Sequence, residues 1–175
     1  MNEQPIEMLD GIFDVIYADP PWRYEHSESA NRDIENQYPT MEIEDIKALE
    51  LPIADNAVIF LWATAPKLEE ALGVLNAWGF NYRTCGIWDK EIIGMGYWFR
   101  GQHELLLVGV KGVFSPPEPG IRKSSVYQEK RGDHSQKPDY FYNLIESYFP
   151  NGRYLELFAR SKHNDKWAVW GNETK

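Results

Sequence analysis

The sequence predicts a single α/β domain, built on a mostly parallel sheet with helices on both faces. Short apolar runs rich in β-favouring residues alternate along the 175 residues with stretches of helical spacing. Such alternation is typical of a doubly wound sheet. The expected strands cover residues 13–18, 57–63, 81–88, 104–110, 154–158 and 167–170, and the expected helices cover residues 42–49, 66–78 and 138–149.

The first expected strand, residues 13–18, ends at an unusual turn. The run Phe-Asp-Val-Ile-Tyr-Ala has no helical spacing and favours a strand buried on both faces. Pro20 and Pro21 cannot continue a strand, because proline lacks an amide donor and has a fixed φ. The chain must therefore leave the sheet at Asp19, with Trp22 close behind. In α/β proteins this edge binds ligands, although a stiff turn without function remains an alternative.

The expected helices have clear limits. Ile43, Ile46 and Leu49 recur at a spacing of three, and the second helix ends before Gly79, a residue that favours helix termination. Pro138 occupies the first turn of the third helix, where its missing N–H costs nothing. These positions predict three amphipathic helices that cover the sheet.

Two irregular stretches, residues 23–40 and 111–136, are expected to be substrate-facing loops of the single domain 1–175. The first is polar without apolar periodicity, as expected for a loop at the mouth of a site. Residues 111–137 contain six Lys or Arg and three Asp or Glu, a local net charge of +3, whereas the whole chain carries −9. The basic segment is a candidate for phosphate contacts, and an ordinary solvated loop is the alternative.

Composition excludes several classes of protein. A hydrophobic content of 43% with 14% aromatic residues argues against disorder, and no run approaches the roughly 18 apolar residues of a membrane span. Cys85 is the single cysteine, so neither an internal disulfide nor a cysteine-based zinc site is expected, and no histidine pair has metal-ligand spacing. The N-terminus lacks signal-peptide features. We therefore expect a cytoplasmic protein without metal that does not coat nucleic acid non-specifically.

Familiar catalytic motifs are absent from the sequence. There is no phosphate loop, no Gly-x-Gly-x-x-Gly after a strand and no Gly-x-Ser-x-Gly elbow. The sequence does offer a carboxylate, a proline carbonyl and an aromatic ring, which follow one another at the end of the first expected strand. That set suits the binding of a flat base with an exocyclic amine.

An ordered series of motifs resembles the MT-A70-like adenine-N6 methyltransferases over nearly the whole chain. The motifs are Ala18-Asp19-Pro20-Pro21-Trp22, Tyr38-Pro39-Thr40-Met41, Phe60-Leu61-Trp62, Trp88-Asp89-Lys90, Gly96-Tyr97-Trp98, His103-Glu104-Leu105, Val108-Gly109-Val110-Lys111-Gly112, Gln136-Lys137-Pro138-Asp139, Glu156-Leu157-Phe158-Ala159-Arg160 and Trp170-Gly171-Asn172-Glu173. The resemblance implies a permuted (β-class) Rossmann-like methyltransferase that depends on S-adenosylmethionine. In this arrangement the target-amine motif precedes the donor-binding segment.

The resemblance also implies the roles of individual residues. Asp19, Pro20, Pro21 and Trp22 would form the catalytic motif, with Asp19 and the Pro20 carbonyl facing the target amine. The donor would be bound by Asp19, Lys137, Phe158, Arg160, His163, Asn164, Asn172 and Glu173. Adenine's amine is a poor nucleophile because its lone pair is delocalised into the ring. Acceptance of both N–H hydrogens would favour a pyramidal nitrogen with its lone pair directed at the donor's methyl group.

Substrate contacts are expected from aromatic and basic residues. Trp22 and Tyr38 would stack on a base turned out of its strand, and the candidate phosphate ligands are Arg122, Lys123, Lys130 and Arg131. We expect DNA as the substrate in a prokaryotic or phage-infected cell. RNA, another amine and a catalytically silent subunit of a methyltransferase complex remain alternatives. No separate recognition module is evident, so the loops, a partner chain or a second copy in a dimer would select the target.

Overall fold

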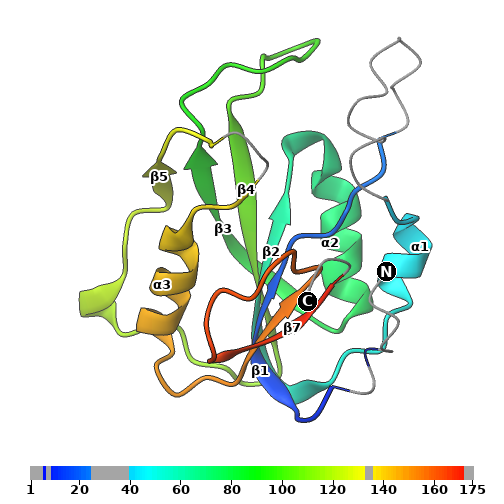
Figure 1. The fold of residues 1–175 in the computed structure, drawn as a ribbon, viewed down its shortest axis with the longest axis vertical. Helices are drawn as coiled ribbons and strands as arrows, with labels where there is room; N and C mark the ends of the chain where they lie inside the picture. The colour runs from blue at the N-terminus through cyan, green and yellow to red at the C-terminus, as the bar shows by residue number, and fades with distance from the viewer. Residues whose placement is uncertain (1–5, 7–8, 25–39, 133–135, 172–175) are drawn as a thin grey trace.

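The computed structural model describes residue 6 and residues 9–24, 40–132 and 136–171 (Figure 1). Its strands form one sheet with the order β5-β3-β4-β2-β1-β6-β7. The strands are β1 (Phe13–Ala18), β2 (Ile53–Ala63), β3 (Asn81–Asp89), β4 (His103–Lys111), β5 (Val126–Gln128), β6 (Tyr154–Leu157) and β7 (Trp167–Trp170). The sheet is mixed but mostly parallel, as the sequence predicts.

Strand directions bring distant segments to one edge of the sheet. β1 is parallel to both of its neighbours, β2 and β6, whereas β4 is antiparallel to both β2 and β3. β3 therefore runs in the same direction as β1. The carboxyl ends of β1, β2, β3 and β6 meet at one edge together with the amino end of β4. We call this the Asp19 edge.

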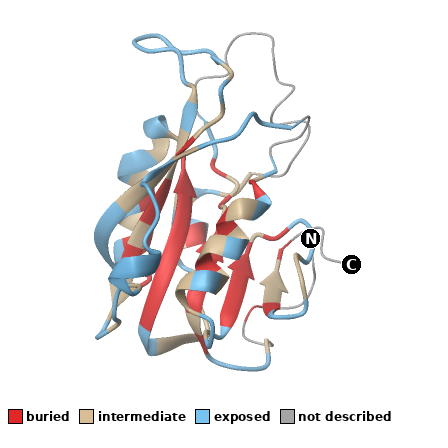
Figure 2. Cartoon of the chain, turned by 90° about the vertical axis from the view of Figure 1, so that its left-hand side faces the viewer, coloured by how far each residue is buried: buried red, intermediate tan, exposed pale blue. Residues whose placement is uncertain are grey.

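Helices cover both faces of the sheet, as expected. Ile16 and Ala18 of β1 pack with α1 (Ile43–Lys47) and α2 (Leu68–Ala77) on one face. Val15 and Tyr17 face the other side, where α3 (Asp139–Tyr148) packs. Figure 2 shows that the central strands are buried between these layers. Neighbouring residues of β1 point alternately into the two cores, which explains why residues 15–18 are all apolar and buried.

Several details differ from the sequence-based expectation, and β2 begins at Ile53 rather than at residue 57. β5 and a 3₁₀ turn, Pro119–Ile121, lie inside the stretch 111–136 that was expected to be irregular. β5 is too short for a visible alternation pattern and forms by pairing with β3. Pro138 is the N-cap of α3 rather than a residue of its first turn. Most of the other expected loop, residues 25–39, lies outside the described residues.

The described helices include none that is long and apolar enough to cross a membrane.

Candidate active site

Asp19 lies where β1 leaves the sheet. Its backbone N–H donates to the Leu157 carbonyl at 3.4 Å, so the residue still follows the direction of the strand. The following turn is closed by hydrogen bonds from the Trp22 N–H to the Pro20 carbonyl, at 2.8 Å, and from the Met41 N–H to the Pro21 carbonyl, at 3.1 Å. The two prolines thus fix a turn that presents the Asp19 carboxylate at the edge of the sheet.

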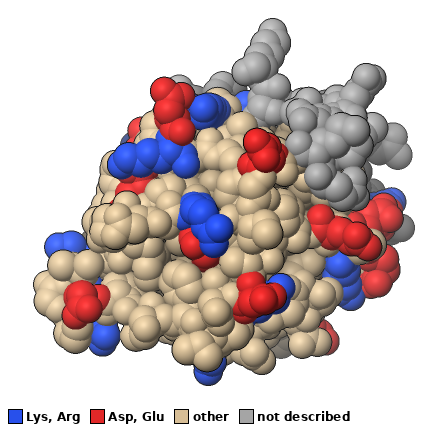
Figure 3. Space-filling view, turned by 90° about the horizontal axis from the view of Figure 1, so that it is seen from below, with Lys and Arg blue, Asp and Glu red and all other residues tan. Residues whose placement is uncertain are grey.

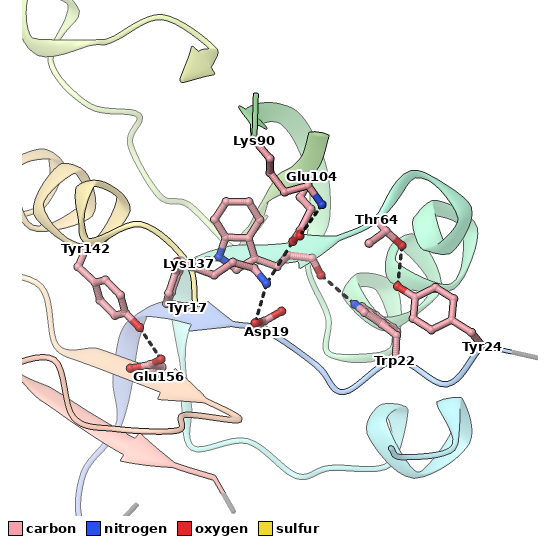
Figure 4. Close-up of polar contacts among 11 residues, drawn as sticks. Tyr17, Asp19, Trp22, Tyr24, Thr64, Lys90, Glu104, Lys137, Tyr142 and Glu156 are labelled. Atoms are coloured by element: carbon pink, nitrogen blue, oxygen red, sulfur yellow. Dashed lines mark hydrogen bonds and ion pairs between the residues drawn. The ribbon is translucent and has the colours of Figure 1, made fainter. Parts of the chain in front are cut away.

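Lys137 joins two carboxylates at this edge (Figure 4). Its ammonium lies 2.8 Å from Asp19 Oδ2 and 3.1 Å from Glu104 Oε2, while Lys90 lies 3.2 Å from Glu104 Oε1. The Lys137 side chain is 10% exposed, and its Nζ is 5.4 Å from the centroid of the Trp62 ring. Asp19, Lys137, Glu104 and Lys90 therefore form a chain of alternating charges.

The two central members of this chain hold each other in the charged form. Burial by itself disfavours the ammonium, but Asp19 and Glu104 more than offset it, and the pKa of Lys137 is raised. Burial likewise opposes ionisation of Glu104, and Lys137 with Lys90 outweighs it, so the pKa of Glu104 is lowered. Both groups are therefore ionised at neutral pH.

A pocket of about 270 Å³ opens beside this charge chain, between the ends of β1 and β6 and the start of α3. It contains both cationic and anionic groups, which suits a ligand that carries both a carboxylate and positive charges, such as S-adenosylmethionine. Its lining residues are Tyr17, Asp19, Gln136, Lys137, Asp139, Tyr142, Glu156, Phe158, Arg160, Ser161, Lys162 and His163.

Glu156 provides an unused acceptor in the pocket. The side chain is on β6, is only 7% exposed, and accepts a hydrogen bond from the Tyr142 hydroxyl at 2.6 Å through Oε1. Among the described residues, its other oxygen, Oε2, is buried without a hydrogen-bond partner. Because such an atom costs free energy unless it finds a donor, the pocket fits a ligand with a donating or cationic group. Burial raises the pKa of Glu156 to about 7.

This pKa predicts how Glu156 affects stability. The folded protein keeps the proton up to a pH of about 7, whereas the unfolded chain loses it near the ordinary value of 4.5. The folded state therefore binds more protons between these values, and the free energy of unfolding decreases as the pH rises through them. Glu156→Gln keeps the hydrogen bond with Tyr142 and removes the titration. We expect the variant to be more stable above pH 7, by at most about 3 kcal/mol.

Denaturant unfolding at about pH 5 and about pH 8 tests this expectation. The wild-type protein should lose more stability between the two values than Glu156→Gln does. An equal loss in both proteins would show that Glu156 is already ionised in the folded state at about pH 5.

The turn after β6 is tight although it lacks glycine. Phe158 adopts a φ of 63°, a left-handed conformation that is rare for a bulky residue and costs about 1–3 kcal/mol. Gly171, which follows β7, packs directly against this turn. A Cβ atom on Gly171 would lie 2.1 Å from the Ala159 carbonyl oxygen. The close approach of the two segments therefore depends on the glycine that follows β7 and not on a glycine in the turn after β6.

The expected donor ligands do not all face the pocket. Phe158, Arg160 and His163 line it, and the His163 ring stacks on Tyr142 with 4.2 Å between centroids. Asn164 instead donates from Nδ2 to Glu146 Oε1 at 2.7 Å, near the carboxyl end of α3. In this structure Asn164 therefore stabilises the loop between β6 and β7 and does not line the pocket. Asn172 and Glu173 lie outside the described residues.

Trp22, one of the two residues expected to stack on a base, is buried in the structure. Trp22 is 8% exposed, and its indole N–H donates to the Trp62 carbonyl at 3.1 Å. This position favours a supporting role for Trp22 beneath the turn. Tyr38 lies outside the described residues. Tyr24, which the sequence did not single out, is partly exposed and shares a hydrogen bond with Thr64 at 2.8 Å.

The four candidate phosphate ligands separate into two pairs. Arg131 lies at the Asp19 edge, where its N–H donates to the Lys90 carbonyl at 3.3 Å, and Lys130 precedes it. Lys123 lies at the other end of α3, bonded through its N–H to the Tyr148 hydroxyl, and Arg122 precedes it. Seen from that opposite end, charges of both signs are interspersed among neutral residues (Figure 3). The structure thus brings one pair, but not the other, to the site.

Glu104 and Lys90 were not predicted as site residues, although both lie in the motifs that carry the resemblance. The missing signal was strand direction. Glu104 reaches the Asp19 edge because β4 is antiparallel and begins there. In an all-parallel sheet the same residue would lie at the far end.

Fold and site together are those of a Rossmann-like methyltransferase, with a carboxylate at the tip of a central strand and a mixed-charge pocket beside it. A family model described as MT-A70 matches residues 13–173. The chain therefore belongs to the MT-A70 family, whose members are S-adenosylmethionine-dependent methyltransferases.

Similar proteins occur in bacteria and animals. The chain is 33% identical over 181 residues to the Type II methyltransferase M.MunI of a Mycoplasma species, covering 92% of this chain and 77% of that protein. It is 33% identical over 174 residues to the human N(6)-adenosine-methyltransferase catalytic subunit METTL3, covering 93% of this chain but 28% of METTL3. It is 34% identical over 174 residues to the N(6)-adenosine-methyltransferase MT-A70-like protein of Drosophila melanogaster, covering 93% of this chain and 27% of that protein.

Proposed function

We propose that this protein transfers a methyl group from S-adenosylmethionine to the N6 amine of adenine in nucleic acid, with DNA as the favoured polymer. The observation that carries the proposal is the pair of Asp19 and Lys137, which lie 2.8 Å apart at the mouth of the mixed-charge pocket. We further propose that the protein acts in the cytoplasm of a prokaryotic or phage-infected cell, alone or as part of a dimer.

Lys137 and the pocket acids would hold the donor, which when bound supplies a methyl group activated on a sulfonium. The Lys137 ammonium has three N–H donors, of which two are directed at Asp19 and Glu104. The third would bind the donor's carboxylate. Glu156 Oε2 and the Asp19 carboxylate would face its positively charged groups. Arg160 and His163 would line the remainder of the pocket.

Asp19 would orient the target base. Its carboxylate would accept one N–H of the adenine amine, and the Pro20 carbonyl would accept the other. That carbonyl already accepts the Trp22 N–H at 2.8 Å, but a carbonyl oxygen has a second lone pair. Two acceptors would favour a pyramidal nitrogen with its lone pair directed outward. Positioning of this kind contributes up to roughly 7–11 kcal/mol. The amine would lose its proton to water after the methyl group has been transferred, so no general base with a shifted pKa is required.

Two observations support the nature of the substrate. Relatives named as N(6)-adenosine-methyltransferases match 93% of this chain. We favour DNA because M.MunI, which is designated a Type II methyltransferase, is matched over most of its own length, whereas the chain spans only about a quarter of the animal proteins.

Transfer of a labelled methyl group tests the proposal. Purified protein is incubated with labelled S-adenosylmethionine and unmethylated double-stranded DNA, single-stranded DNA or RNA, and product nucleosides are identified by mass spectrometry. We expect N6-methyladenine in DNA. N6-methyladenine found only in RNA would show that the substrate is RNA rather than DNA. Donor binding without product on any polymer would contradict activity by the single chain and direct the search to a partner.

A further inference from the structure

The loop between β3 and β4, residues 90–102, carries large apolar side chains in full solvent. Met95, Tyr97, Trp98 and Phe99 are 89%, 99%, 95% and 90% exposed. Figure 1 shows the loop projecting beyond the sheet, and Figure 2 shows its tip exposed. Several large apolar side chains exposed together on one loop mark a candidate interaction site. We call Tyr97, Trp98 and Phe99 the aromatic tip.

Backbone hydrogen bonds give the loop a definite shape. The Gly94 N–H donates to the Gly101 carbonyl at 2.7 Å, and the Gly101 N–H donates to the Met95 carbonyl at 3.2 Å. A Cβ atom on Gly96 would lie 2.0 Å from the Phe99 carbonyl oxygen, so the turn requires glycine there. The aromatic tip is thus held out from a closed turn.

The base of the loop is joined to the active site. Lys90 pairs with Glu104 at 3.2 Å, and Glu104 pairs with Lys137, which contacts Asp19. Because the loop leaves β3 at its carboxyl end, it rises from the same edge of the sheet as Asp19. A polymer whose base reached Asp19 would therefore have its neighbouring nucleotides near this loop.

Positive charges lie beside the base of the loop. The segment after β5 runs along it, with the Glu129 N–H bonded to the Asp89 carbonyl at 3.1 Å and the Arg131 N–H bonded to the Lys90 carbonyl at 3.3 Å. Lys130 and Arg131 are both exposed there. The loop thus has aromatic rings at its tip and cations beside its base, and proteins use aromatic rings to bind the bases and cations to bind the phosphates of nucleic acid.

We propose that the aromatic tip stacks on bases of the nucleic acid beside the target adenine, while Lys130 and Arg131 contact the adjacent phosphates. The inference rests on the proposed function, because it extends the substrate site. The proposal names nucleic acid rather than a second copy of the chain because Lys130 and Arg131, which are exposed beside the loop, match a polyanion.

Anisotropy with a fluorescein-labelled DNA duplex and the matching single strand tests the inference. We expect Trp98→Ala to weaken binding about 10-fold, and Tyr97→Ala with Trp98→Ala about 100-fold, because each stacked base is lost separately. Trp98→Phe keeps a stacking face and should bind nearly as well as wild type. Val113→Ser removes an apolar side chain of similar exposure, 86%, just after β4 at the opposite edge of the sheet, and should have no effect.

The outcomes separate this inference from the proposed function. Methylation by the wild type with unchanged affinity of the Trp98→Ala variant would overturn the inference alone. Loss of affinity in that variant, with no N6-methyladenine formed by the wild type, would support the inference and overturn the proposed function. No binding of either DNA probe by the wild type, together with no N6-methyladenine in any polymer, would overturn both. Light scattering that shows a dimer dissociated by Trp98→Ala, with unchanged nucleic-acid affinity, would identify the loop as a self-association surface instead.

Discussion

Asp19→Asn is expected to lower the rate of methyl transfer by roughly 10³-fold, the scale on which a lost orienting hydrogen bond and a lost charge act together. Asparagine has nearly the same shape, but its amide carries one oxygen and a donating NH₂ in place of two acceptors. One of its orientations would direct N–H against the N–H of the adenine amine. The rate is measured in a single turnover at saturating donor, so that weaker donor binding does not contribute.

The protein should remain folded in this variant. Lys137 keeps its ion pair with Glu104 at 3.1 Å, and the β1 strand is held by its neighbours rather than by the Asp19 carboxylate. Asp14→Asn is a matched control, because Asp14 is also on β1 and is ion-paired with Arg153 at 3.1 Å, at the far end of the strand. Control rates should equal wild type. A single-turnover rate of Asp19→Asn within a few-fold of wild type would contradict the role of Asp19.

The centre of the site could be predicted because strand ends are visible in the sequence. Asp19 follows a strand that two prolines terminate, whereas Lys137 is assigned to the donor site by the family resemblance, and the pattern alone shows only that it precedes a helix with an apolar face. The two residues are 118 positions apart, yet their side chains bond at 2.8 Å. Strand and helix ends meet at one edge of an α/β sheet, so their convergence follows from the fold class.

The remaining features depend on information that local patterns do not contain. The role of Glu104 requires the direction of β4, which periodicity does not give. Trp22 is buried because its indole N–H reaches the Trp62 carbonyl, a contact between residues 40 positions apart. Asn164 is held by Glu146 on α3, which only the packing of the loop reveals. Glu156 Oε2, which has no hydrogen-bond partner among the described residues, likewise becomes visible only when its surroundings are known.

Lys137→Met is expected to weaken S-adenosylmethionine binding by roughly 10- to 100-fold, the range for a lost hydrogen bond to a charged group. The variant should also lose stability, by roughly 3 kcal/mol, because removal of one partner leaves buried charge unpaired. Calorimetric titration measures the affinity, and denaturant unfolding measures the stability. Lys90→Met is a control, in which the affinity for S-adenosylmethionine should equal that of wild type. Lys90 also pairs with Glu104, at 3.2 Å, but it belongs to the base of the 90–102 loop and is not among the residues that line the pocket.

A second substitution separates the two effects of Lys137. In Lys137→Met with Glu104→Gln, the buried carboxylate that faced the lysine is neutral, so part of the lost stability should return, while Lys90 loses its ion pair and Asp19 still lacks Lys137. Donor affinity should stay low, because the double variant still lacks the ammonium that would bind the donor's carboxylate. Recovery of both quantities together would mean that Lys137 only balances Glu104, and the donor's carboxylate would then have to be held by another cation that lines the pocket, of which Arg160 and Lys162 are the candidates.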